Sequence, residues 1–294
     1  MQNSQLTHIF RSLNKKETRE LRKWLLSPFH NQREDVLQLF DYFQEKDYLN
    51  NDPKLKKELV FQKIFPGEAY DDARMRQTIH FLQKCTEDFL AYKEFQEEPT
   101  RRELLLAEGY RRRNLDRLFE KALKGLNDNQ RQSRVKNEEF LQANILIQSL
   151  EYKYISEKKR TPDTNLQTYS DALDLYFIAG KLRLASLITA VQKIYTQDIR
   201  VGLLEEALHY VESNGLPELP AIRVYYFIYK SLSDPANEHF FFSLKEAIFQ
   251  YDHYFSPEEQ RDILLLAVNY CIAKMNTGVT RFIVEAFDLY KRGN

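Results

Sequence analysis

The chain is poor in the two residues that make turns, because its 294 residues include only 8 glycines and 9 prolines. Proteins built from many strands, or from alternating strands and helices, need far more turn glycines. The scarcity of both residues therefore predicts long helices joined by short loops. Apolar residues make up 43% of the chain, a share that argues against intrinsic disorder.

Cysteines and long apolar runs are also scarce. The two cysteines, Cys85 and Cys271, have neither the spacing of a metal site nor the number of a disulfide framework, which suits a reducing compartment. No stretch approaches the roughly 18 uncharged apolar residues of a membrane span. No signal peptide is visible at the N-terminus. We therefore expect a cytoplasmic protein that makes no contact with a membrane.

The chain carries no net charge, since 43 basic side chains balance 43 acidic ones. A dedicated duplex-DNA protein needs a basic field to displace counterions, so nucleic acid is not the expected partner. The charges are unevenly spread: residues 98–160 hold 15 basic and 10 acidic side chains, and residues 161–294 hold 12 and 17. A nucleic-acid-associated regulator that uses the N-terminal bundle and the basic stretch 98–160 stays open as an alternative.

Signatures of catalysis and of cofactor binding are missing. The chain has no Gly-rich phosphate loop, no Gly-x-Ser-x-Gly and no His-Glu-x-x-His. His209 with Glu205 and Glu206 comes nearest to a metal-ligand cluster on a helix, and we interpret it as an exposed charged face. We therefore expect no catalytic residues, no metal and no cofactor. An enzyme with an unrecognised site is the second alternative.

Helix signals run along the whole chain. Three Asn or Ser residues precede a Glu by three positions, the spacing of a capping box. These pairs are Asn14–Glu17, Asn31–Glu34 and Ser256–Glu259. Apolar residues recur at helical steps and predict fifteen helices. Their expected ranges are 5–12, 15–26, 32–46, 53–64, 71–96, 101–112, 114–127, 135–158, 165–179, 182–196, 200–213, 218–232, 237–253, 257–275 and 279–291.

The clearest domain boundary lies at Glu97-Glu98-Pro99, directly after the fifth expected helix. We expect an N-terminal helical bundle over residues 1–97 and a second domain over residues 98–294. In the second domain three segments share a Tyr-x-Ile pattern at intervals of 50 and 44 residues, in the range at which helical hairpins stack into solenoids. They are Tyr176-Phe177-Ile178, Tyr226-Phe227-Ile228 and Tyr270-Cys271-Ile272.

The second domain resembles degenerate tetratricopeptide repeats. One segment follows the order of that helix pair, with Asn114 at the turn; its residues are Leu104, Leu105, Ala107, Tyr110, Asn114, Phe119, Leu123 and Leu126. Leu173–Leu187, with a turn at Gly180, resembles a second pair. The resemblance implies an all-α fold in which the N-terminal bundle is followed by an α-α hairpin solenoid.

Three further segments are similar to uncharacterised cytoplasmic proteins of Bacteroidota-type bacteria. They are Phe65-Pro66-Gly67 with Tyr70-Asp71-Asp72, Leu173-Asp174-Leu175-Tyr176, and Asn269-Tyr270-Cys271-Ile272. This resemblance implies helical repeats and supplies no activity.

The densest basic cluster is Arg111-Arg112-Arg113 with Arg117, and Glu108 is near enough to pair with it. Consecutive residues on a helix point in different directions, so only part of this cluster shares one face. We interpret it as a solvated charged surface, with a patch for an anion or an acidic partner as the alternative.

Aromatic side chains mark a candidate partner site. Tyr225 and Tyr226 point about 100° apart on a helix, so they cannot both face one core. If the expected helix 218–232 lines a concave side, Arg223, Tyr225, Tyr229 and Asn269 form a strip that binds a peptide.

The last expected helix, 279–291, is rich in apolar residues, although a solenoid normally ends with a polar capping helix. We expect either a homo-oligomer partner that covers this helix or a fragment of a longer chain. Taken together, the patterns predict a non-enzymatic scaffold that binds a protein or peptide along a helical-repeat surface.

Overall fold

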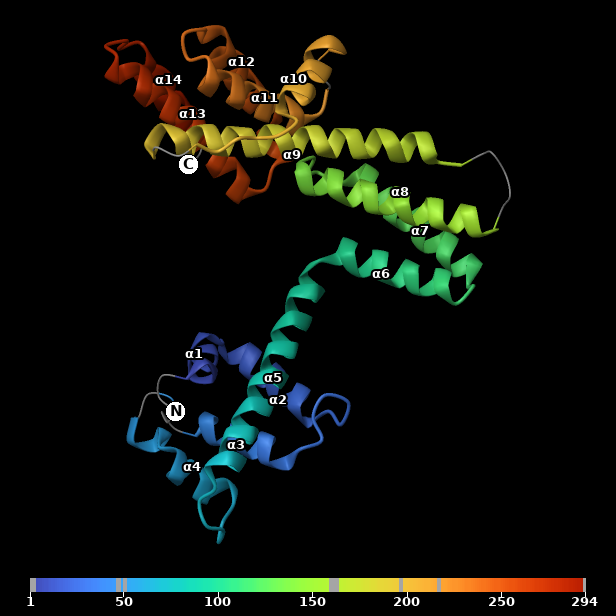
Figure 1. Ribbon diagram of the computed structural model, residues 1–294, viewed down its shortest axis with the longest axis vertical. Coiled ribbons are helices and arrows are strands. Elements are labelled where there is room, and N and C mark those ends of the chain that lie inside the picture. Colours follow the sequence, from blue (N-terminus) through green and yellow to red (C-terminus); the bar gives the residue numbers. More distant parts are fainter. Residues whose placement is uncertain are drawn as a thin grey trace. The chain divides into compact units, whose positions relative to one another are not determined.

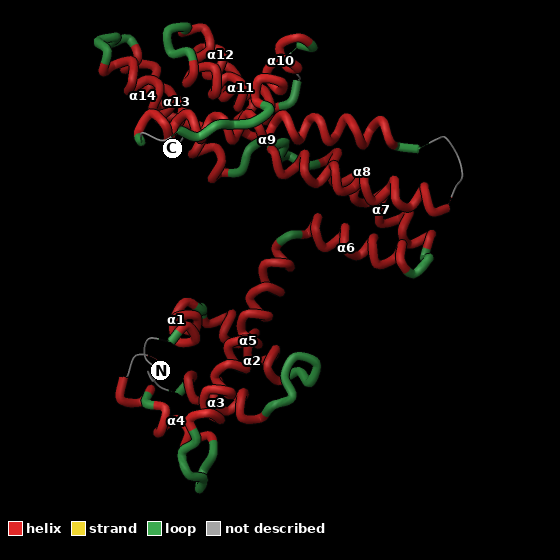
Figure 2. The backbone as a smooth tube through the Cα atoms, in the orientation of Figure 1, coloured by secondary structure: helices red, strands yellow, loops and turns green. Residues whose placement is uncertain are grey.

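The structure is a computed structural model and describes residues 4–45, 49, 52–158, 164–195, 198–215 and 218–292. Over these residues the chain is helical and contains no strand (Figure 2), so the predicted all-α class is confirmed. The chain divides into two compact units, Met1–Pro99 and Thr100–Asn294. None of the described helices has the length and apolar character needed to cross a membrane.

The first unit is organised around one long helix. Its elements are α1 (Gln5–Ser12), α2 (Lys15–Leu26), α3 (Glu34–Gln44), the 3₁₀ helix η2 (Asp52–Leu55), α4 (Lys57–Ile64) and α5 (Asp72–Glu97). α5 packs against each of the other four α-helices (Figure 1). Apolar stripes at steps of three and four residues meet in the core. There Phe40 and Phe61 are fully buried, and the Phe10 ring lies 5.6 Å from that of Phe40.

The predicted helix starts in this unit have different outcomes. The capping box at Asn14 is confirmed: its Oδ1 accepts from the Glu17 amide at 3.0 Å, and the Glu17 carboxylate accepts from the Asn14 amide at 2.8 Å. The box at Asn31 is wrong, because α3 begins after Arg33. The Asn31 side chain bonds instead to the backbone carbonyls of Leu25, in the last turn of α2, and of Arg33, which fixes the loop between α2 and α3.

The second unit is a longer succession of helices. After α6 (Pro99–Arg112) come α7 (Asp116–Gln132), α8 (Glu138–Lys158), α9 (Leu166–Ile194), α10 (Leu204–Ser213), α11 (Pro220–Ser233), α12 (Glu238–Tyr251), the 3₁₀ helix η3 (Asp252–Tyr254), α13 (Pro257–Asn276) and α14 (Phe282–Arg292). Asn114 turns the chain between α6 and α7 with φ of 56°, a left-handed conformation that asparagine tolerates.

The predicted turn at Gly180 is wrong, because residues 166–194 form the single helix α9 of 29 residues. Gly180 lies inside that helix, where a β-carbon would stand 3.2 Å from Oε1 of Glu138 at the start of α8. The glycine therefore permits a close approach between two helices and makes no turn. α9 packs against α8, α10 and α11 (Figure 1).

The recurring Tyr-x-Ile segments serve mainly as core. Ile178, Tyr226, Ile228 and Tyr270 are all buried in the main core of the second unit. The third isoleucine, Ile272, is exposed. A smaller core between α6, α7 and α8 contains Phe119, whose ring stacks on that of Tyr154 at 4.2 Å.

Candidate functional site

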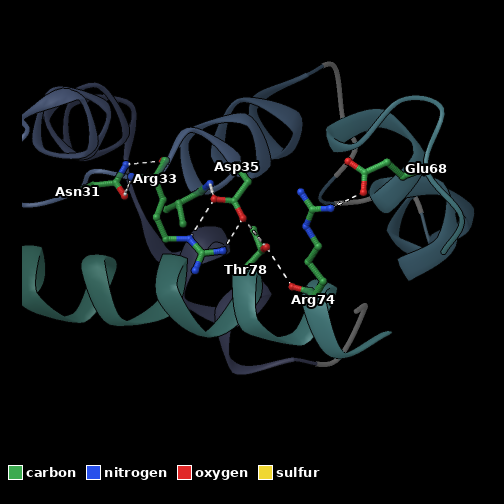
Figure 3. Close-up of polar contacts among 7 residues, drawn as sticks. Asn31, Arg33, Asp35, Glu68, Arg74 and Thr78 are labelled. Carbon is green, nitrogen blue, oxygen red and sulfur yellow. Dashed lines mark hydrogen bonds and ion pairs between the residues drawn. The ribbon is translucent and has the colours of Figure 1, made fainter. Parts of the chain in front are cut away.

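The loop between α2 and α3, residues 27–33, is held rigidly by its own hydrogen bonds. The amides of His30 and Asn31 each donate to the Ser27 carbonyl at 3.0 Å. The Asn31 side chain donates to the Leu25 carbonyl at 3.0 Å. It also donates to the Arg33 carbonyl at 2.9 Å and accepts from the Arg33 amide at 3.0 Å (Figure 3). Local hydrogen bonds thus fix the path of the loop before any ligand arrives.

A second set of contacts ties the end of this loop to α5. Arg33 forms a two-point ion pair with Asp35, at 3.0 and 2.6 Å, and the Thr78 hydroxyl on α5 donates to the same carboxylate at 2.8 Å (Figure 3). Burial would raise the pKa of Asp35, but the hydrogen bonds from Arg33 and Thr78 hold it below its ordinary value. The Asp35 carboxylate therefore ties the end of the loop to α5.

The same end of α5 carries another cation that lies on an aromatic ring. The Arg74 guanidinium pairs with Glu68 (Figure 3) and lies 3.8 Å from the centre of the Phe65 ring. Its backbone carbonyl accepts from the Thr78 hydroxyl at 3.1 Å. Arg74 is thus occupied by contacts within the unit and is not presented to an anion.

This loop contributes Phe29 and His30 to an aromatic surface that also includes Trp24 of α2 and Tyr92 of α5. We call this surface the aromatic corner. The Phe29 side chain is 90% exposed, the highest value among the exposed large apolar residues. His30 stacks on Trp24 with ring centres 3.4 Å apart, and the Tyr92 ring lies 5.1 Å from that of Trp24. The indole nitrogen of Trp24 is buried and has no hydrogen-bond partner among the described residues. The corner therefore has both an exposed apolar ring and an unused donor.

The exposed area of the corner is mainly aromatic and apolar. Phe29 and Tyr92 offer apolar area. The nearest polar groups, the His30 ring and the Cys85 thiol, do not form a pair of nucleophile and base. The thiol of Cys85 donates to the His30 carbonyl at 3.6 Å, and burial raises the pKa of that thiol, which keeps it protonated. In the part of the chain that the structure describes, no group of His, Cys, Asp and Glu side chains could hold a metal ion.

The predicted peptide-binding strip does not form one surface. Tyr225 is only 3% exposed, and its hydroxyl donates to the Glu259 carboxylate at 2.6 Å, so its predicted role as a surface residue is wrong. Arg223 lies about 160° around α11 from Tyr225, because each residue advances the helix by about 100°. It pairs with Glu218 at 2.8 Å. Tyr229 is half-buried and Asn269 is exposed on α13, and their roles in binding stay predictions.

The predicted basic cluster is largely neutralised. Arg111 has a side chain only 12% exposed and pairs with Glu108 and with Glu157. Arg112 is exposed and pairs with the same Glu108 at 2.8 Å. Arg113 donates to a backbone carbonyl of its own helix, and Arg117 is exposed at the start of α7. These contacts favour the interpretation as a charged surface over an anion patch.

We expect the Glu108 pairing to make stability depend on acid pH. The hydrogen bonds from Arg111, opposed by burial and aided by Arg112, lower the pKa of Glu108 to about 2, against about 4.3 in an unfolded chain. A carboxyl group whose pKa is lower in the folded than in the unfolded chain stabilises the fold at pH values above its unfolded-state pKa. That stabilisation is lost as the pH falls through the folded-state pKa. Urea unfolding of the parent and of Glu108→Gln should differ by about 1–2 kcal/mol at pH 6 and by about half as much at pH 3. A difference that stays constant over this range would contradict the assignment.

The sequence patterns did not predict the aromatic corner, because they concern residue spacings typical of helices and of catalytic sites. One local signal was present: Phe29 follows a proline in a loop between two helices, where it can join neither apolar stripe. Compared with protein-family models, with curated proteins and with solved structures, the chain shows no significant similarity to any of them.

Proposed function

We propose that the protein is a non-enzymatic scaffold that binds another protein, and that the aromatic corner is a contact surface of its first unit. The observation that carries this proposal is the exposure of Phe29 on a loop whose path is fixed by hydrogen bonds. Exposed aromatic anchors that fill a pocket on a partner are the typical hot spots of protein interfaces. The partner is a folded protein or peptide with an apolar pocket that accepts a phenyl ring.

The energetics support an anchor role. Burying a phenyl ring that is nearly fully exposed stabilises a complex by about 1.5–3 kcal/mol. A loop that is already ordered loses little conformational entropy on binding, so most of that gain is kept. Tyr92 adds amphipathic area at the edge of the corner.

The helical succession of the second unit supports a scaffold role of the wider chain. We propose that residues 98–294 are a degenerate array of helical hairpins resembling tetratricopeptide repeats, in which α11 to α14 pack in chain order. The uninterrupted α9 is a departure from that pattern, since it replaces one hairpin by a single helix. We also propose a cytoplasmic location, which is what the resemblance of three sequence segments to Bacteroidota-type proteins implies. Two thiols that form no disulfide suit that compartment.

The proposal is tested by Phe29→Ser in the full chain. The change should leave the free energy of unfolding within about 0.5 kcal/mol of the parent, because the ring is exposed. Partners would be captured from the native cell with the parent protein and identified by mass spectrometry. Binding of each purified partner to the variant should be weaker by roughly tenfold or more, which is about 1.4 kcal/mol.

Phe287→Ser is the matched control, because it makes the same chemical change on an exposed phenyl ring of α14. Retained binding in that variant and loss in Phe29→Ser would support the aromatic corner. The reverse pattern would contradict it and favour the C-terminal helix as the contact surface.

A further inference from the structure

The outer face of α2 carries charge of one sign. Its exposed charged residues are all basic: Lys15, Lys16, Arg19, Arg22 and Lys23. Both signs of charge are normally interspersed on the surface of a soluble domain. A surface of one sign attracts partners of the opposite sign and raises the rate at which they associate. The outer face of α2 is thus complementary to an acidic surface.

The two acidic residues of α2 lie at the flanks of this face and already have partners. The Glu17 carboxylate accepts from the backbone amide of the N-cap residue at 2.8 Å. The Glu20 carboxylate pairs with Lys93 of α5 at 2.8 Å. Both glutamates are half-buried, so they leave the outer face basic.

Most cations on this face have no partner within the unit. Arg22 pairs with Asp41 of α3 at 2.9 Å. None of the other four forms an ion pair with another residue that the structure describes. Exposed arginine and lysine side chains without a partner can pair with a second molecule without breaking a contact of their own. The charge of these four residues is therefore available for recognition.

Three of the four cations continue into an apolar residue along one line. Lys16, Arg19, Lys23 and Leu26 follow one another at steps of three, four and three residues, which keep side chains on one face of a helix. We call these four residues the α2 stripe. At a rise of 1.5 Å per residue the stripe is about 15 Å long. Leu26 is 50% exposed and is the last residue of the helix.

The apolar end of the α2 stripe adjoins the aromatic corner. Phe29 follows Leu26 by three residues, and three residues of chain span at most about 11 Å. At the same end of the stripe Lys23 precedes Trp24, a member of the corner. Basic charge and exposed apolar area therefore lie next to each other on the first unit.

We infer that the partner bound at the aromatic corner is an acidic protein, whose carboxylates border the pocket for Phe29 and pair with the α2 stripe. The inference rests on the proposed function and adds the charge of the partner to it. Complementary charges at the edge of an apolar contact raise the association rate and select against partners of the wrong sign.

An anionic membrane would offer the same charge, but the packing of α2 favours a protein. A helix that lies in a membrane interface buries its apolar face among the lipids. The apolar face of α2 is already used, because Leu21 and Leu25 are buried in the core of the first unit. Only Leu26 and the loop residue Phe29 remain to enter a bilayer.

Charge inversion in the full chain tests the inference with a defined probe. The probe is a fluorescein-labelled peptide of eight glutamates followed by two leucines, and its binding is followed by fluorescence anisotropy at about 50 mM salt. The parent should bind the peptide and lose most of its affinity at about 500 mM salt, where charges are screened. Lys16→Glu, Arg19→Glu and Lys23→Glu combined should raise the dissociation constant at least tenfold.

The matched control makes the same three inversions on an exposed face of α7, as Arg117→Glu, Lys121→Glu and Lys124→Glu. This variant should bind the peptide as the parent does. Circular dichroism and thermal unfolding verify that both variants are folded. A parent that does not bind the peptide overturns the inference. So does an equal loss in the two triple variants, or no loss in the α2 variant.

Phe29→Ser separates this inference from the proposed function. A partner or peptide that Phe29→Ser weakens and the α2 variant does not would overturn the inference and leave the proposed function standing. The opposite pattern would contradict the aromatic corner and leave the acidic partner of α2. Vesicles with about 30% phosphatidylserine test the lipid source of negative charge. A parent that sediments with these vesicles but does not bind the peptide overturns the inference in favour of a membrane.

Discussion

Glu259→Ala should lower the free energy of unfolding of the second unit by about 2–5 kcal/mol. The Glu259 side chain is buried and accepts from the Tyr225 hydroxyl at 2.6 Å and from the Asn137 amide at 2.7 Å. Removing the carboxylate leaves two buried donors without an acceptor, and each unpaired donor costs about 1–3 kcal/mol. Chemical denaturation followed by circular dichroism measures the loss.

The network explains why the effect should be large and specific. Asn137 precedes α8, Tyr225 is on α11 and Glu259 is in the first turn of α13, so one carboxylate joins three helices that are distant in the chain. Ser256 still caps α13, since its hydroxyl accepts from the Glu259 amide at 3.3 Å. The Glu259 carboxylate, which the sequence pattern assigned to the same cap, is turned inward.

Glu259→Gln is the matched control. Its carbonyl oxygen can accept from Asn137, and its amide can donate to the Tyr225 hydroxyl, which is able to accept. Asn137 itself is fixed because its Oδ1 accepts from the Phe140 amide at 3.1 Å. We expect a loss of only about 1–2 kcal/mol. Equal losses in the Ala and Gln variants would show that the hydrogen bonds do not account for the effect.

Phe241→Ala should be the other strongly destabilising change, with a loss of about 3–5 kcal/mol from the lost apolar burial and the cavity it leaves. Phe241 is fully buried on α12. Its ring stacks on Tyr270 with centres 4.8 Å apart and meets the edge of Phe282 at 5.3 Å, so it joins α12 to α13 and α14. The unfolding transition of the second unit, followed by calorimetry, should fall by roughly 10 °C.

Its neighbour Phe242 provides the control on the same helix. Phe242 is partly exposed and lies farther from Phe282, at 6.2 Å. We expect Phe242→Ala to cost less than about 1 kcal/mol, since a truncated side chain near the surface leaves no closed cavity. Similar losses for the two variants would contradict the central role of the Phe241 layer.

Most of the candidate site could not be read from the chain. The rigidity of the 27–33 loop could be anticipated in part, because asparagine and proline favour turns. The exposure of Phe29 could not, since it depends on whether another element of the first unit covers the ring. The same limit applied to Tyr225 and Tyr226: their spacing shows that they diverge by about 100°. Only the position of Glu259, 34 residues further on, decides that Tyr225 points inward.

What the sequence determined by itself was local. The all-α class and helix ends such as the Asn14 box follow from spacing and capping, which act within a few residues. The tertiary structure decided what depends on distant neighbours. Gly180 lies inside a helix where a turn was expected, and Glu138 of α8 occupies the space beside it. Glu259 leaves its predicted cap for Tyr225 and Asn137, because a buried carboxylate must satisfy donors from other helices. The burial and pairing of side chains arise from contacts between segments that are distant in the chain, and a local sequence pattern cannot predict them.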